Sequence, residues 1–276
     1  MKLKISIVFF SCLFVFNLVA NAQDIPIEYL DMEAENNQSK YFKNVLENEI
    51  KGVEVIHETI TDGLAENVSI DKNYKTIYLF IKGNGLLETK SKTYNIVPET
   101  IFLPNVVEGL SFKPVKSDTL HYIKISVLQT EQDKIDLKEF PKEHTEAIYF
   151  AKFTDCEAYT EAIKSPQTTS RTILPNKYIP RVAMGTVETI GPDKVGAHEH
   201  PMLEQLFLGL TTNETIVYAD DARINFPEYS ILHIPLGSSH SVEVKESSKM
   251  YYVWMDFFRD KKGEEWLKTH KKKDDN

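Results

Sequence analysis

Short runs of apolar residues, separated by glycine, proline, asparagine and aspartate, are the main pattern along the chain. Runs of this kind predict β-strands, because strands are short and are bounded by residues that favour turns. Residues 76–81 form one such run, and Gly83-Asn84-Gly85 after it predicts a hairpin that returns from Leu86 onward. Further strands are predicted at 101–103, 122–128, 182–190, 205–210, 231–234 and 250–258.

Helical patterns are sparse by comparison. Residues 155–164 predict one helix between the two halves of the chain, and residues 262–271 predict another near its end. Many short strands with few helices favour an all-β fold, either a sandwich or a barrel of antiparallel strands.

The chain contains an internal repeat. Residues 95–104 resemble residues 225–235 when small insertions are allowed, and each segment follows an apolar strand and precedes another. The closing prolines, Pro104 and Pro235, lie 131 positions apart, which is about the length of one domain. We therefore expect two domains, 23–164 and 165–276, with the boundary at the polar stretch 165–170.

The first 22 residues have the pattern of a secretory signal peptide. Lys2 and Lys4 precede an apolar core at 5–19, and Ala20-Asn21-Ala22 is a small-x-small cleavage signal. The apolar core is shorter than the roughly 20 residues of a membrane span, so we expect cleavage rather than stable membrane insertion. The sequence thus predicts a secreted or periplasmic protein that begins near Gln23.

Composition narrows the range of partners. The formal net charge is −9, and loss of Lys2 and Lys4 with the signal leaves −11. A surface this acidic repels nucleic acid and anionic lipid, so neither is expected as a partner. Cys156 would be the single cysteine that remains after cleavage, which excludes an intrachain disulfide.

Two short motifs carry the candidate chemistry. His198 and His200 lie two residues apart, so on an extended strand both point to the same face. Glu204 follows them, and the turn that starts at Pro235 ends in His240. Imidazole is the commonest metal ligand in proteins, and three histidines at this spacing predict a metal site.

The same motifs resemble those of the cupin superfamily. In this sequence they read glycine, His-x-His and glutamate over residues 191–204, then Pro-x-Gly-x-x-His over residues 235–240. The resemblance implies a jelly-roll barrel, or double-stranded β-helix, that holds one metal ion near its mouth. Together with the repeat, it implies a bicupin: tandem cupin barrels with few short helices. The implied ligands are His198, His200, Glu204 and His240.

Gln205 competes with Glu204 for the fourth position, because some cupins use glutamine. Strand alternation favours Glu204, since an inward Glu204 shares its face with leucines at 206, 208 and 210. An inward Gln205 would instead share its face with Phe207, Gly209 and Thr211.

The first repeat lacks the ligands. Residues 67–75 contain no histidine, and residues 104–109 keep the turn of the second motif without its histidine. We therefore expect a degenerate first barrel that serves packing. The isolated histidines His57, His121, His144 and His270 are interpreted as ordinary polar or core residues, and His233 as a packing or rim residue.

The predicted ligand set suits one divalent transition metal among Mn, Fe, Co, Ni, Cu and Zn. Open coordination positions favour a metal-dependent enzyme, of isomerase, lyase or hydrolase type, acting on a small oxygen-rich molecule such as a sugar acid. An oxygen-dependent dioxygenase and a non-catalytic small-molecule-binding protein are the alternatives. Analogy with other cupins suggests a homodimer. The candidates for orienting a substrate are Arg181, Tyr178, Tyr218 and Tyr252.

Overall fold

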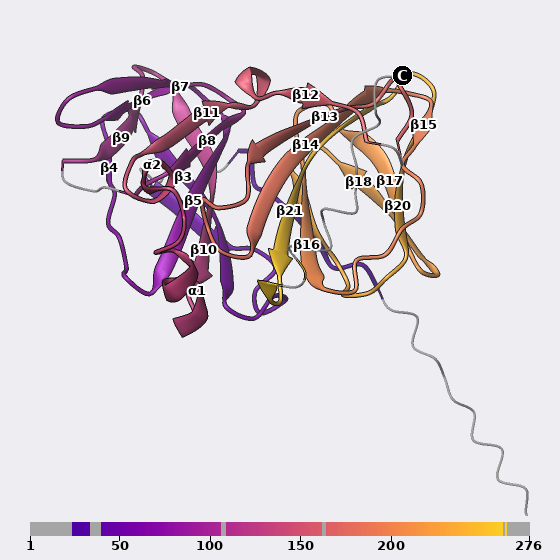
Figure 1. Cartoon of the computed structure of the whole chain (residues 1–276). Helices are drawn as coiled ribbons and strands as arrows, with labels where there is room; N and C mark the ends of the chain where they lie inside the picture. Colours follow the sequence, from indigo (N-terminus) through magenta and orange to yellow (C-terminus); the bar gives the residue numbers. More distant parts are fainter. Residues whose placement is uncertain (1–23, 34–39, 106–108, 162–163, 262, 264–276) are drawn as a thin grey trace, which may run out of the picture.

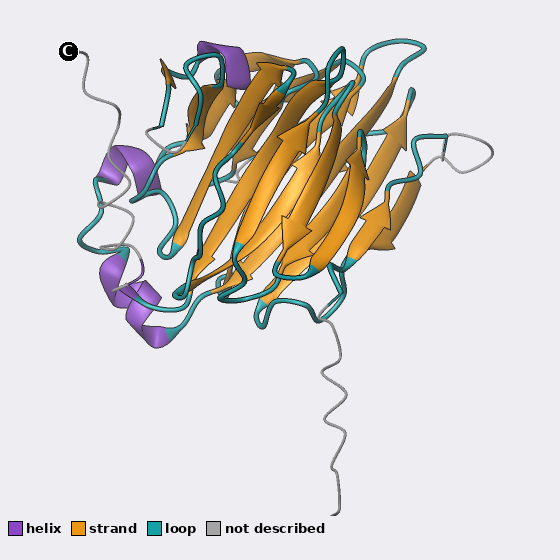
Figure 2. Ribbon diagram, turned by 90° about the vertical axis from the view of Figure 1, so that its right-hand side faces the viewer, coloured by secondary structure: helices purple, strands orange, loops and turns teal. Residues whose placement is uncertain are grey.

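A computed structural model describes residues 24–33, 40–105, 109–161, 164–261 and 263. Two β-barrels lie side by side: the first half of the chain forms one, and the second half forms most of the other (Figure 1). Strands form most of the molecule, with the few helices at its periphery (Figure 2). The all-β prediction and its tandem barrels are therefore confirmed. The proposed signal peptide lies outside the described residues, as does the predicted helix 262–271 apart from Gly263.

The first barrel consists of two facing sheets. Its larger sheet has the order β11-β8-β5-β10-β3-β2, and its smaller sheet has the order β4-β9-β6-β7. The strands of this barrel are β2 (Lys40–Asn44), β3 (Val53–Thr61), β4 (Glu66–Asn67), β5 (Tyr74–Lys82), β6 (Gly85–Glu88), β7 (Thr93–Ile96), β8 (Thr100–Leu103), β9 (Ser111–Pro114), β10 (Thr119–Leu128) and β11 (Tyr149–Lys152).

The second barrel repeats this arrangement. Its larger sheet has the order β1-β19-β16-β21-β14-β13-β12, and its smaller sheet has the order β15-β20-β17-β18. The strands are β1 (Ile27–Tyr29), β12 (Ala158–Tyr159), β13 (Thr169–Leu174), β14 (Val182–Ile190), β15 (Asp193–Lys194), β16 (Leu203–Gly209), β17 (Glu214–Ala219), β18 (Ala222–Pro227), β19 (Ser230–Ile234), β20 (His240–Val244) and β21 (Lys249–Phe258).

The repeat seen in the sequence is a repeat of structure. Residues 95–104 reach from β7 into β8, and residues 225–235 reach from β18 past β19. β8 and β19 occupy equivalent places in the two larger sheets. The strands predicted from apolar runs coincide with β5, β8, β10, β14, β16, β19 and β21.

Two strands cross the boundary that we expected between residues 164 and 165. β1 pairs with β19 at the edge of the second barrel's larger sheet, and β12 pairs with β13 at the opposite edge. Both strands precede residue 165, so that position does not separate the sheets. β11 pairs with β8 at the edge of the first barrel's larger sheet, as β1 pairs with β19 in the second barrel.

Two local predictions were wrong. β5 and β6 do not form a hairpin, because they belong to different sheets and Gly83 lies at the corner between them. Gly83 has φ +85°, and a Cβ there would lie 1.9 Å from the carbonyl oxygen of Thr119, so the corner requires glycine. The helix predicted at 155–164 is also absent from the described residues there, where β12 pairs its backbone with the sheet edge instead.

The helices that follow β10 in the chain are short. α1 (Glu131–Asp136) begins at a capping box in which the Thr130 and Asp133 side chains each bond to the other's backbone N–H. α2 (Lys142–Thr145) and a single 3-10 turn (Phe153–Asp155) follow it. No helix in the described part of the chain is long and apolar enough to cross a membrane.

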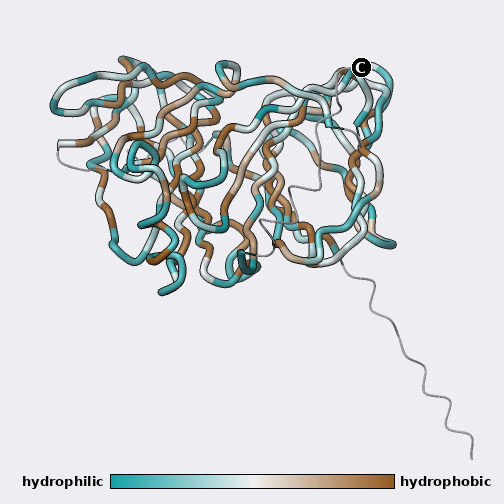
Figure 3. Tube along the Cα trace, in the orientation of Figure 1, coloured by the Kyte–Doolittle hydropathy of each residue, from teal (hydrophilic) through white to brown (hydrophobic). Residues whose placement is uncertain are grey.

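The two larger sheets pack face to face and share one hydrophobic core. The first barrel contributes residues such as Ile77, Leu79 and Ile125, and the second contributes residues such as Leu208 and Met255. Apolar positions run along the strands of both barrels, including the strands that form this shared core (Figure 3). Each of these strands therefore has one face in the shared core and the other face inside its own barrel.

Aromatic rings fill the interior of the first barrel. Tyr78, Phe80, Phe112 and Tyr122 pack with ring centroids 5.2–5.9 Å apart. The Tyr122 hydroxyl donates a hydrogen bond of 2.7 Å to the buried carboxylate of Glu58. Such packing stabilises the barrel, and the Tyr122–Glu58 pair is a polar contact within an otherwise mostly aromatic interior.

Candidate metal centre

Three histidines of the second barrel converge on one point. His198 and His200 lie in the loop between β15 and β16, and His240 is the first residue of β20. One ring nitrogen of each lies within 4.8 Å of those of the other two. The structure thus brings together the three histidines that the sequence predicted as ligands.

Backbone pairing fixes the two motifs against each other. The amide of His198 donates to the carbonyl of His240 at 3.1 Å, and the amide of His240 donates back at 2.9 Å. The two residues therefore form an antiparallel bridge, which holds their side chains on one side of the backbone.

Two of the imidazoles have their tautomers set by carbonyl groups. His198 Nδ1 lies 2.7 Å from the Gly196 carbonyl oxygen, and His240 Nδ1 lies 3.2 Å from that of Ser238. A carbonyl oxygen only accepts hydrogen bonds, so Nδ1 carries the proton in both rings. Each Nε2 then offers a lone pair, which is the arrangement found in metal-binding histidines.

Burial keeps the histidine on β20 neutral. Burial first, and then the neighbouring His198, lower the pKa of His240 to about 3. His240 Nε2 is buried and has no hydrogen-bond partner among the described residues. A buried neutral imidazole with an unpartnered nitrogen fits a metal ligand.

Gln205, not Glu204, lies on the side of β16 that faces the histidines. Gln205 lines the cavity that His198, His200 and His240 also line. Its amide nitrogen donates to Asp256 on β21 at 2.6 Å, and its amide oxygen is buried with no partner among the described residues. The amide oxygen of Gln205 therefore fits the fourth position beside the three imidazoles.

Glu204 points to the opposite face, toward the shared core. Its carboxylate lies 3.2 Å from Nε2 of His233, whose Nδ1 lies 2.9 Å from the Glu49 carboxylate. The structure therefore corrects the expectation that Glu204 joins the histidines. His233, interpreted from sequence as a packing or rim residue, is held between two carboxylates.

The histidines open into a cavity of about 350 Å³. Its walls come mainly from the strands of the second barrel and include Phe207, Tyr252 and Trp254. Residues just before β13 close another side, although the sequence analysis had assigned them to the first domain. Cavities that bind small molecules have volumes of about 300–1,000 Å³, so this cavity suits a small ligand.

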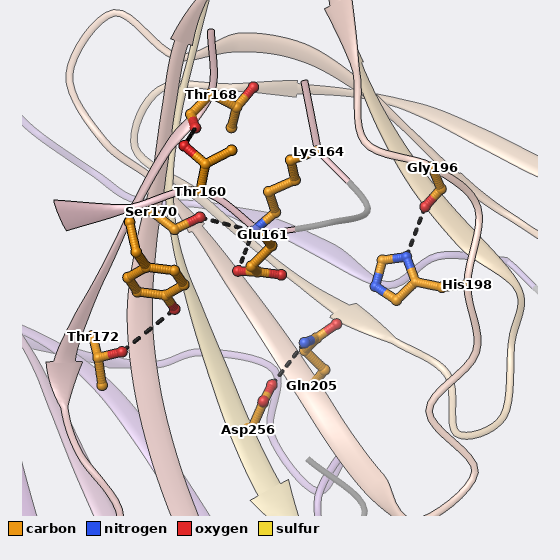
Figure 4. A network of polar contacts seen from close by, with 11 residues as sticks. Thr160, Glu161, Lys164, Thr168, Ser170, Thr172, Gly196, His198, Gln205 and Asp256 are labelled. Atoms are coloured by element: carbon orange, nitrogen blue, oxygen red, sulfur yellow. Dashed lines mark hydrogen bonds and ion pairs between the residues drawn. The ribbon is translucent and has the colours of Figure 1, made fainter. Parts of the chain in front are cut away.

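Ionic groups that the sequence analysis missed also line the cavity. Lys164 donates to Glu161 at 2.6 Å and to Ser170 at 3.0 Å, and Asp256 accepts from Gln205. Figure 4 shows these side chains around the same space as His198. Burial raises the pKa of Asp256 to about 7, against the opposing effect of the Gln205 hydrogen bond.

A signal for one of these groups was present in the sequence. Asp256 interrupts the apolar run at 250–258, and a carboxylate within a buried strand often indicates a functional site. Lys164 and Glu161 gave no comparable signal, because their stretch was predicted to form a helix between the two halves.

Of the four residues predicted to orient a substrate, only Tyr252 lines this cavity. Arg181 forms a two-pronged ion pair with Asp133 of α1, with both nitrogen–oxygen distances 2.7 Å, and so joins the two halves. Tyr178 stacks on His144 with a centroid distance of 4.0 Å. The Tyr218 hydroxyl donates to Glu243 at 3.0 Å.

Comparison with known proteins finds solved structures of similar fold. No family model and no curated protein sequence matches the chain. AerE from Microcystis aeruginosa aligns with a TM-score of 0.61 and 8% identity, over 86% of this chain and 99% of that one. A cupin 2 conserved barrel domain protein from Leptotrichia buccalis aligns with a TM-score of 0.51 and 12% identity, over 80% of this chain and 89% of that one.

A third similar structure is a variant of oxalate decarboxylase from Bacillus subtilis. It aligns with a TM-score of 0.56 and 10% identity, over 81% of this chain and 74% of that one. At such low identity these alignments establish the fold alone. Taken with the two repeated barrels and the three histidines, they show that the chain has the two-barrel cupin fold.

Proposed function

We propose that the second barrel binds one divalent transition metal ion through His198, His200 and His240, with the Gln205 amide oxygen as a fourth ligand. The observation that carries this proposal is the convergence of three imidazoles, two of them with Nδ1 bonded to a carbonyl so that Nε2 faces the cavity. Mn, Fe, Co, Ni, Cu and Zn all accept nitrogen and oxygen ligands of this kind.

We propose further that the protein is an enzyme acting on a small oxygen-rich molecule, without net redox change. The bound metal would supply Lewis-acid catalysis at a substrate oxygen. Asp256 would hold the Gln205 side chain in place, and the aromatic wall formed by Phe207, Tyr252 and Trp254 would shield the bound substrate from bulk solvent. An isomerase, lyase or hydrolase reaction on a sugar acid fits these parts.

Metal analysis of protein purified without added metal tests the first proposal. We expect about one transition-metal ion per chain in the unsubstituted protein, and loss of most of it in His198→Ala and in His240→Ala. His144→Ala, which changes a histidine stacked on Tyr178 away from the cavity, is the control and should keep its metal. Equal metal content in all four proteins would contradict the assignment.

Turnover assays test the second proposal. Metal-loaded protein should convert at least one member of a sugar-acid panel, and removal of the metal with a chelator should abolish that activity. Oxygen uptake is measured in the same reactions, because uptake coupled to turnover would favour the dioxygenase alternative. Binding without turnover of any panel member would favour a non-catalytic binding protein.

We also propose that the protein is exported and begins near Gln23 after cleavage. Support comes from the basic start, apolar core and small-x-small signal in residues 1–22. Mass spectrometry of the protein from its native host tests this, because retention of residues 1–22 would contradict cleavage.

A further inference from the structure

Lys164 lies in the wall of the metal-site cavity with its side chain only 5% exposed. An ammonium group has three donors. Two of them point to Glu161 Oε1 and Ser170 Oγ, at 2.6 and 3.0 Å. The described residues thus supply acceptors for two donors, and the group lines the cavity where a ligand can accept from the third (Figure 4).

Burying the Lys164–Glu161 ion pair costs desolvation free energy, which a pair with a purely structural role would not need to bear. Burial lowers the pKa of Lys164, against the opposing effect of Glu161, so the folded protein disfavours the charge that it holds there. An ion pair of equal geometry on the surface would avoid the desolvation cost. The location therefore points to a use for the ammonium inside the cavity.

The charges around the cavity favour an anion once a metal is bound. The charges of Lys164 and Glu161 cancel, and the three histidines and Gln205 are neutral ligands. A divalent ion then leaves the cavity positive even when Asp256 is ionised. A carboxylate is the anion that best matches an ammonium in a small organic molecule, because its oxygens accept short charge-assisted hydrogen bonds.

We propose that Lys164 binds the carboxylate of a small organic acid whose other oxygens face the three histidines. This inference rests on the proposed metal site and names the substrate class for it. Lys164 is thus a substrate-binding residue that sets specificity for acids over neutral analogues. Glu161 competes with the carboxylate for the ammonium and holds it in place when the cavity is empty.

Pairs of acids and their amides test this role, because the two members of a pair match in size. We would titrate glycolate against glycolamide, lactate against lactamide, and D-glucuronate against D-glucuronamide by calorimetry, on protein with and without metal. The unsubstituted metal-loaded protein should bind at least one acid tenfold or more tightly than its amide, since a charge-assisted bond is lost with the amide.

Three variants separate the lysine from the general charge of the cavity. The double variant Glu161→Gln/Lys164→Met removes the ion pair as a neutral unit, so any loss reflects the missing donor; its acid preference should fall to about twofold or less. Glu161→Gln alone releases the ammonium from its competitor and should tighten acid binding several-fold. Ser170→Ala keeps both charges and should retain the preference.

Two results would overturn the inference. These are an unchanged acid preference in the double variant, which would place the carboxylate elsewhere, or no preference for any acid in the unsubstituted protein. Metal content and thermal unfolding are measured on every variant, so that loss of the metal or of the fold is seen directly. An acid preference that depends on Lys164 in protein without metal would uphold this inference even if the metal proposal failed.

Discussion

At the scale of single residues, Glu204 and Gln205 show where alternation along a strand can mislead. The leucines at 206 and 208, which share a face with Glu204, pointed to that face as the barrel interior. They belong instead to the core shared by the two larger sheets, while Phe207 lies inside the second barrel. Both faces of β16 are apolar, so hydrophobicity alone does not tell them apart.

The orientation of β16 gives the first prediction. Gln205→Leu should weaken metal binding by about tenfold or more, because it removes the amide that lies between the histidines and Asp256. Glu204→Gln should change metal affinity by less than about twofold, since its side chain faces His233. Titration of the metal-free proteins with one metal gives both values, and the reverse order would mean that Glu204 is the ligand.

Motifs with fixed spacing predicted the candidate site better than single residues did. His198, His200 and His240 were predicted correctly to lie together because their local sequences dictate the loop and turn that present them. Lys164 and Asp256 reach the same cavity from elements far apart in sequence, so only the assembled barrel reveals them.

At the scale of elements, His233 connects β19, β16 and the segment before β3. Burial lowers the pKa of His233, but the hydrogen bonds and charges of Glu204 and Glu49 outweigh this and raise it. The folded protein therefore holds this proton more tightly than the unfolded chain does. The stabilisation is fully present below the unfolded pKa, near pH 6.5, and is lost as pH rises through the folded value.

His233→Gln tests the second prediction. We expect it to lower the free energy of unfolding by about 1 kcal/mol at pH 6, since hydrogen bonds to charged groups stabilise a fold and Glu49 is partly exposed. The difference from the unsubstituted protein should shrink toward pH 9. Urea unfolding of the metal-free proteins across this range measures it, and a difference that grows with pH would show the opposite linkage.

Gly185 on β14 gives the third prediction, also at the scale of elements. A Cβ at this position would lie 2.3 Å from Trp254 Cζ2 and 2.5 Å from the Arg171 carbonyl oxygen. Gly185→Ala should therefore displace the Trp254 ring, which lines the cavity, and lower the free energy of unfolding by about 1–3 kcal/mol. Fluorescence emission and urea unfolding report the two effects. Unchanged emission with unchanged stability would show that the ring does not need this space.

At the scale of the whole molecule, the shared core predicts that the two barrels unfold together. Leu79 of the first barrel is fully buried in this core. Leu79→Ala should lower the free energy of unfolding by about 2–5 kcal/mol. Trp254 lies on β21, so its fluorescence reports on the second barrel. Fluorescence and far-ultraviolet circular dichroism should shift by the same denaturant concentration, and two separate transitions would contradict a single cooperative unit.

The sequence predicted the class of fold well and its connections less well. Apolar runs identified most long strands because burial on both faces leaves a strong signal, as at β10 and β14. The two-residue strand β12 has no such signal, and neither does the pairing of β1 with the second barrel. Both depend on sheet edges formed by distant residues.

The pairing of β1 with β19 has a consequence for synthesis of the chain. Ile27 pairs with Leu232, which is made 205 residues later. At translation rates of about 5–20 residues per second, roughly 10–40 seconds separate the two strands at the ribosome. During that interval the first barrel can assemble, while β1 stays without its strand partner. An early strand is therefore among the last to be placed, and the growing chain displays an apolar segment that chaperones can bind until the second barrel closes over it.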